Sequence, residues 1–71
     1  MQNTQIQQSS INERLLTQAQ VAQITGMSSA WLEMARFKGT GIPYVKIGRS
    51  VRYRQQDIEK FISDHYVGTG I

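Results

Sequence analysis

The sequence predicts a mainly α-helical fold with one small β-hairpin, in the order helix, turn, helix, hairpin, helix. Two short segments carry the residues that start and stop helices, and a glycine-centred segment at residues 44–54 fits a hairpin. After it, Ile58, Phe61 and Ile62 recur at the spacing of one helix face. At 71 residues the chain is long enough for one domain with a modest core.

The first helix is predicted from its ends. The sequence TQAQ at residues 17–20 has the spacing of a capping box, and Leu16 and Val21 are placed for a hydrophobic staple around it. Gly26 supplies the stop, because glycine readily takes the left-handed conformation that ends a helix. We therefore expect a short helix that begins after residue 17 and ends before residue 26.

The second helix follows the same pattern. Ser28 is placed to cap it, with Met27 and Leu32 as its staple, and Gly39 marks its end. Leu32 and Ala35 give this helix an apolar inner face. Two capped helices a few residues apart, with glycine in the turn, form a helix-turn-helix pattern.

The hairpin is predicted to turn through a three-residue loop, Gly48-Arg49-Ser50. This register keeps the apolar residues on one face, whereas a two-residue loop would place Arg52 opposite Val45 and mix the two faces. The other face is then a cationic wing with Arg49 at its tip. The expected pairs are Ile47 with Val51 and Val45 with Tyr53 on the apolar face, and Lys46 with Arg52 and Tyr44 with Arg54 on the outer face.

The charge is unevenly distributed along the chain. The net charge is +3, but residues 36–54 contain six basic residues and no acid, while the remaining residues contain two basic residues and five acids. A surface that serves only solubility mixes charges of both signs, and crowding like charges costs self-repulsion. The run therefore predicts contact with the phosphates of a polyanion.

The N-terminal part of the second helix carries the candidates for base contact, because a helix-turn-helix places this part in the major groove. Ser29 can donate or accept a hydrogen bond, Ala30 can touch a thymine methyl group, and Glu33 can accept from a cytosine amino group. Ser28 and Ser29 fit a cap and first turn without base contact equally well. The predicted DNA contacts are Ser28, Ser29, Ala30, Glu33, Arg36, Lys38, Lys46, Arg49, Arg52 and Arg54.

The residue types give no support for catalysis or for metal binding. One histidine, no cysteine and five scattered acids supply neither a metal site nor a convincing nucleophile and base. We expect a non-enzyme that needs no cofactor. The lone tryptophan, Trp31, fits two roles, either core packing or stacking at the DNA interface.

The chain divides into three expected regions. Residues 1–13 are rich in glutamine, asparagine and serine and are expected to form a flexible polar arm. Residues 14–66 form the expected DNA-binding domain, and residues 67–71 a flexible tail. Because no apolar run approaches membrane-spanning length and the N-terminus lacks signal-peptide features, we expect a soluble cytoplasmic protein with no membrane partner.

A specific combination of residues lies between Leu16 and Phe61. It consists of Leu16-Thr17, Val21-Ala22, Gly26, Ser28, Leu32, Gly39-Thr40-Gly41, Pro43, residues 45–49, residues 51–53 and Asp57. In this combination the chain resembles the small helix-turn-helix proteins of the excisionase and AlpA-like regulator group, which have a MerR-like winged-helix fold. The resemblance implies a recognition helix in the major groove and a wing on the adjacent backbone or minor groove of double-stranded DNA. The DNA contacts that it implies are Ser29, Arg36, Lys38, Lys46, Arg49, Arg52 and Arg54.

The resemblance implies one of two roles. An excisionase of a prophage or other mobile element bends DNA, binds beside neighbouring copies of itself and assists an integrase or recombinase; a small transcriptional regulator occupies an operator. The alternative from another class is a protein-interaction adaptor whose basic hairpin binds an acidic partner. That alternative predicts no binding to duplex DNA at moderate salt.

Overall fold

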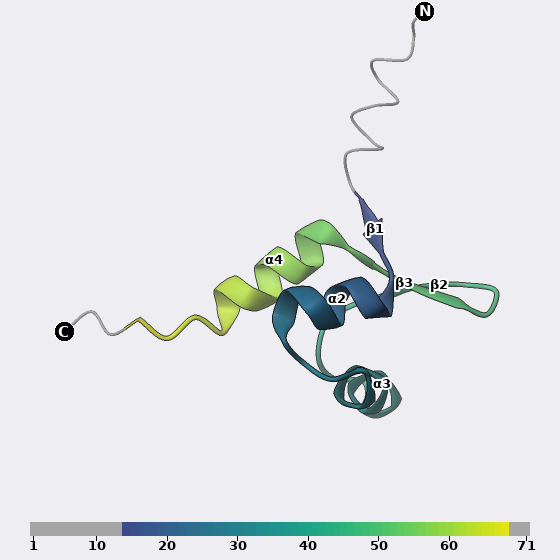
Figure 1. Ribbon diagram of the computed structural model, residues 1–71, viewed down its shortest axis with the longest axis horizontal. Coiled ribbons are helices and arrows are strands. Elements are labelled where there is room, and N and C mark those ends of the chain that lie inside the picture. The colour runs from purple at the N-terminus through teal and green to yellow at the C-terminus, as the bar shows by residue number, and fades with distance from the viewer. Residues whose placement is uncertain (1–13, 69–71) are drawn as a thin grey trace, which may run out of the picture.

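The computed structural model describes residues 14–68, and this region contains three helices and a small antiparallel sheet (Figure 1). The sheet has the strand order β1-β3-β2. The predicted mainly α fold with a hairpin wing is confirmed, whereas the arm predicted at residues 1–13 and the last three residues of the predicted tail lie outside the described region. The elements are β1 (Leu15–Leu16), α2 (Gln18–Thr25), α3 (Ser29–Lys38), β2 (Val45–Ile47), β3 (Ser50–Arg54) and α4 (Gln55–Asp64).

The caps predicted for α2 and α3 are confirmed. The Thr17 hydroxyl accepts a hydrogen bond from the Gln20 backbone N–H at 3.2 Å, and the Gln20 side-chain oxygen accepts one from the Thr17 N–H at 2.9 Å. The Ser28 hydroxyl accepts from the Trp31 N–H at 3.0 Å. Gly26 and Gly39 end the two helices in the left-handed conformation. These local bonds fix where each helix of the helix-turn-helix begins and ends.

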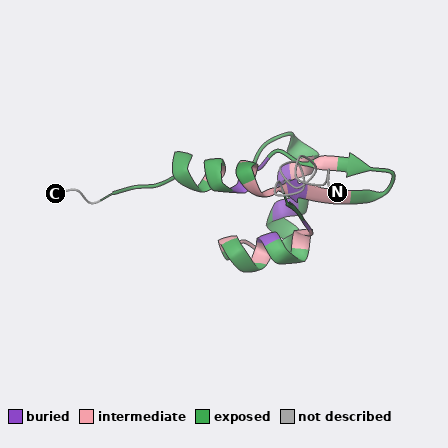
Figure 2. Ribbon diagram, turned by 90° about the horizontal axis from the view of Figure 1, so that it is seen from above, coloured by how far each residue is buried: buried purple, intermediate pink, exposed green. Residues whose placement is uncertain are grey.

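The core lies where the two helices, the sheet and α4 meet. Its buried side chains come from every helix and strand except β2, and from the connection before β2: Leu16 from β1, Val21 from α2, Leu32 from α3, Ile42 from the connection, Tyr53 from β3 and Ile58 from α4. Figure 2 shows that the buried residues gather at this junction and that the hairpin end and the far end of α4 are exposed. Helix α3 and the hairpin, through β3, are therefore both anchored in one small core.

Strand β1 is an element that the sequence did not reveal. It pairs with β3, with Leu15 opposite Arg54 and Leu16 opposite Tyr53. Opposite residues in an antiparallel pair share a face, so this pairing places the buried Leu16 and Tyr53 side chains together. The outer edge of β3 is therefore covered by chain that precedes α2.

The predicted register of the hairpin is wrong. Val45 lies opposite Arg52, Lys46 opposite Val51 and Ile47 opposite Ser50, so the loop has two residues, Gly48 and Arg49. The turn chemistry explains the difference. Gly48 has a φ of +61° and no non-glycine residue described has a positive φ, which suits a type II′ turn with glycine first. The three-residue alternative prefers a left-handed residue at its third position, which here is a serine.

The register correction redistributes the side chains of the hairpin. Lys46 shares a face with Val51, while Arg52 and Arg54 share the other face with Val45. The predicted separation into one apolar face and one cationic face is therefore wrong as well. Ile47, expected to be buried, is 58% exposed near the tip.

Helix α4 starts directly after β3 and leads away from the core (Figure 1). Ile58 is buried and Phe61 packs against the core, as the helical spacing predicted. Further along, Ile62 and Tyr66 are exposed, so only the first half of the apolar face is covered. None of the helices between residues 14 and 68 has the length and apolar character that a membrane crossing requires.

Candidate nucleic-acid interface

The face of α3 opposite the core is exposed along the helix. Leu32 and Ala35 are buried, whereas Ala30, Met34 and Phe37 are exposed. Residues at i, i+4 and i+7 lie on one side of a helix, so the last three form a single surface stripe. Figure 1 shows α3 nearly end-on beneath α2, with the hairpin extending in another direction from the same core. The stripe is therefore accessible to a large partner.

Arg36 joins α3 to the sheet. Its Nη1 donates to the Tyr53 hydroxyl of β3 at 2.6 Å and to the Gln18 side-chain oxygen of α2 at 2.7 Å. Its Cζ also lies 5.8 Å from the centre of the Tyr44 ring. Charged donors make hydrogen bonds about twice as strong as neutral ones. This predicted phosphate contact thus has a structural role within the protein, and its contact with DNA stays a prediction.

Gln18 completes this network on the other side. Its side-chain nitrogen donates to the Glu33 carboxylate at 3.0 Å, while its oxygen accepts from Arg36. One carboxamide at the start of α2 therefore holds two polar side chains of α3, three residues apart. The predicted base contact Glu33 is exposed, but its carboxylate is drawn toward α2. Neither Gln18 nor the Tyr53 hydroxyl was anticipated from the sequence, since their partners lie 15 to 18 residues away.

The first turn of α3 contains the remaining candidates for base contact. Ser28 is the cap, so its hydroxyl is already engaged with the Trp31 N–H. Ser29 and Ala30 follow and are exposed, as expected for residues that face a groove. Lys38 is exposed at the other end of the helix. The structure thus places Ser29 and Ala30 near one end of the exposed surface of α3 and Lys38 near the other.

The hairpin carries three of the predicted cations away from the core. Lys46 is exposed on β2, Arg49 is exposed at the turn, and Arg52 is half-buried on β3. Arg52 Nη1 donates to the backbone carbonyl of Val51 at 2.8 Å, which orients the guanidinium without neutralising it. We name Lys46, Arg49 and Arg52 together the wing cations. They lie on more than one face of the hairpin, so they surround it rather than lining one side.

Arg54 differs from the wing cations. Its guanidinium makes a bidentate contact with Asp57 in the first turn of α4, at 2.9 Å from Nε and 3.1 Å from Nη2. The hydrogen bond from Arg54 lowers the pKa of Asp57 below its ordinary value, against a smaller opposing effect of burial. The pair fixes the junction of β3 and α4. The DNA contact predicted for Arg54 stays untested.

Trp31 is 37% exposed and packs one part of its ring against the protein. Its ring lies 6.3 Å from that of Phe61 on α4, centre to centre, at 59°. A Cβ added at Gly41 would lie 3.7 Å from the Trp31 ring and 2.7 Å from the Ala35 Cβ. Glycine at residue 41 therefore lets the chain after α3 pass close to the helix. The contacts cover part of the ring while 37% of the residue is exposed, so both roles considered for Trp31 stay predictions.

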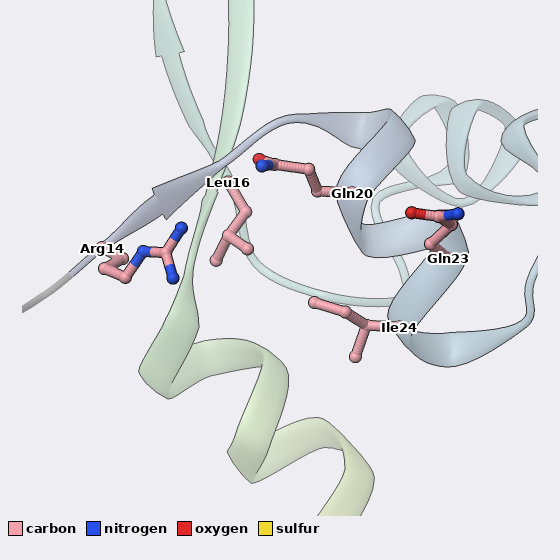
Figure 3. Close-up of a pocket in the computed structure, with 5 residues that line it drawn as sticks. All are labelled: Arg14, Leu16, Gln20, Gln23 and Ile24. Atoms are coloured by element: carbon pink, nitrogen blue, oxygen red, sulfur yellow. The ribbon is translucent and has the colours of Figure 1, made fainter.

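Residues between 14 and 68 line several surface pockets. One lies between β1 and α2 and is lined by Arg14, Leu16, Gln20, Gln23 and Ile24 (Figure 3). These side chains provide a cation, two carboxamides and two aliphatic groups, so the lining of this pocket contains no pair of nucleophile and general base. Within the described region no group of three or more potential metal-binding side chains comes together.

Comparison with known families agrees with this geometry. Residues 15–66 match the family model described as a helix-turn-helix domain, and this range runs from β1 to just beyond α4. No curated protein and no solved structure gives a significant match. The family is one of DNA-binding domains rather than enzymes. Since the match covers well over half of the 71 residues, the chain belongs to the helix-turn-helix domain family.

Proposed function

We propose that this protein binds specific sequences in double-stranded DNA, with α3 in the major groove and the β2–β3 wing on the adjacent backbone or minor groove. The observation that carries the proposal is the joint anchoring of α3 and the wing. Both are built on one core, and the Arg36–Tyr53 hydrogen bond links them directly. A fixed relation between two DNA-contacting elements is what reading a sequence requires, because phosphate contacts set the register and base contacts specify.

The positive charges support the same docking. Lys38 and the wing cations are not paired with carboxylates in the described region, and each is placed on α3 or on the hairpin. Three of the five acids of the chain, Asp57, Glu59 and Asp64, lie instead on α4. This segregation leaves α3 and the wing as the electropositive part of the domain, as expected for a surface that meets phosphate. We assign phosphate contact to Lys38 and the wing cations, and base contact to Ser29 and Ala30.

For its biological role we propose either an excisionase-type recombination directionality factor or a small transcriptional regulator, encoded by a prophage or other mobile element. This proposal rests on the resemblance between Leu16 and Phe61 described above. Both roles use the same groove contacts. They differ in what happens to the DNA, since an excisionase binds several adjacent sites, bends the duplex and assists a recombinase, whereas a regulator needs one operator.

The test begins with selection of binding sites from a random duplex library by the full 71-residue chain. Enrichment of one sequence is expected, followed by protection of that sequence in footprinting. Circular-permutation electrophoresis then measures bending. Protection of several adjacent sites with a marked bend supports the excisionase role, and one unbent site supports the regulator. Failure to enrich any duplex at moderate salt, with capture of an acidic protein instead, would contradict the proposal.

A further inference from the structure

The outward stripe of α3 is unusually apolar for a helix that faces a polyanion. Phe37 is 88% exposed, Met34 is 52% exposed, and Ala30 completes the stripe one turn nearer the N-terminus. Scattered exposed apolar residues need no explanation, but these three adjoin on one face of the recognition helix. Burying the stripe against a partner would remove this apolar surface from water.

Two polar residues in the middle of α3, Glu33 and Arg36, are hydrogen-bonded within the protein. Arg36 donates to Tyr53 and Gln18, and the carboxylate of Glu33 accepts from Gln18. These three bonds draw the Arg36 side chain toward α2 and β3 and the Glu33 side chain toward α2. What the middle of α3 offers to a major groove is therefore mainly methyl, thioether and aromatic surface.

The charges around the stripe favour DNA as its partner. Lys38 lies at the end of the same helix, and the wing cations lie on the hairpin anchored to the same core. Glu33, held by Gln18, is the one acid among residues 14–56. An apolar stripe flanked by cations complements a groove whose floor carries methyl groups and whose walls are phosphates. In the major groove that apolar group is the C5-methyl of thymine.

We propose that α3 recognises its site through pyrimidine C5-methyl groups, which Ala30, Met34 and Phe37 contact in the major groove. The inference rests on the proposed function and adds to it the chemical group that is read. In unmodified DNA the group belongs to thymine, and in methylated DNA the same group is also present on 5-methylcytosine. Selection from an unmodified library and from one with methylated cytosines distinguishes the two sources.

The experiment removes the methyl groups one at a time. In the selected duplex each thymine is replaced by deoxyuridine, which keeps base pairing and hydrogen-bonding groups and lacks only the methyl. For a 5-methylcytosine site the replacement is cytosine. We expect binding to weaken about fourfold for each contacted methyl, which corresponds to about 0.8 kcal/mol for a buried methylene group. Replacements outside the footprint are the DNA control and should have no effect.

Protein variants assign the effect to the stripe. Phe37→Ala and Met34→Ala should each bind the duplex that carries the C5-methyl groups more weakly than the original protein does. Each should also lose most of its preference for that duplex over the methyl-free one at the base position that the altered side chain contacts. Tyr66→Ala is the matched control, since Tyr66 is 78% exposed but lies beyond α4. It should retain full discrimination. Circular dichroism checks the fold of each variant.

The possible results separate the inference from the function on which it rests. A selected duplex that binds equally well with and without its methyl groups would overturn the inference and leave DNA binding intact. Absence of binding to any duplex would overturn both. If Phe37→Ala abolished self-association in sedimentation analysis without changing DNA affinity, the stripe would be a protein interface and the inference would be wrong.

Discussion

Replacing Tyr53 with phenylalanine removes one oxygen atom from the centre of the fold. The Tyr53 ring is 1% exposed, so its packing is preserved, and the lost group is the acceptor of the 2.6 Å bond from Arg36. A hydrogen bond to a charged group contributes about 1.5–3 kcal/mol. Arg36 is only half-buried and keeps its bond to Gln18, so we expect the free energy of unfolding to fall by about 1–2 kcal/mol.

Chemical denaturation measures the loss of stability directly, and thermal denaturation followed by circular dichroism should show a lower Tm, by about 4–8 °C for each kcal/mol. Tyr44→Phe is the matched control, because it deletes the same atom from an exposed tyrosine whose ring alone contacts Arg36. It should change stability by less than about 0.5 kcal/mol. Equal effects of the two substitutions would refute the role assigned to the Arg36–Tyr53 bond.

Two further predictions concern single sites. In chemical denaturation, Gly41→Ala should destabilise the protein more than Gly26→Ala. Both glycines have a positive φ, but of the two only residue 41 would place an added Cβ within 3 Å of another atom. Equal losses of stability in the two variants would contradict this prediction. The depressed pKa of Asp57 means that its bond with Arg54 stabilises the fold above the unfolded pKa of about 3.9, and that this contribution is lost as pH falls toward the lower folded pKa. Asp57→Asn should therefore be less stable at neutral pH and should lose less stability on acidification, and parallel pH profiles for the variant and the original protein would contradict the pairing.

The parts of the fold that depend on neighbouring residues could be predicted from the sequence. The caps at Thr17 and Ser28 and the glycine stops act within one helical turn, so a short stretch of sequence contains the whole interaction. The hairpin was predictable, but its register was not. There, pairing of apolar residues favoured one loop and the positive φ of Gly48 another, and the turn geometry prevailed.

Other features depend on segments that meet only after folding. Strand β1 has two residues, too few to show any alternation, and it forms because β3 offers an open edge. Arg36 belonged to a basic run and was interpreted as a phosphate contact, while its partners Gln18 and Tyr53 lie 18 and 17 residues away. Phe37 was not among the predicted DNA contacts, although its spacing from Ala30 and Met34 was visible in the sequence.

The salt dependence of duplex binding tests most directly whether α3 and the wing form a phosphate-contacting surface. If Lys38 and the wing cations each contact a phosphate, the logarithm of affinity should fall against the logarithm of salt concentration with a slope of roughly −3 to −4. Changing Arg49 and Arg52 to alanine should reduce the slope by about one to two units, whereas Lys60→Ala, which removes a cation paired with Asp64 on α4, should not change it. A slope near zero, or one that the Arg49 and Arg52 substitutions leave unchanged, would contradict the account.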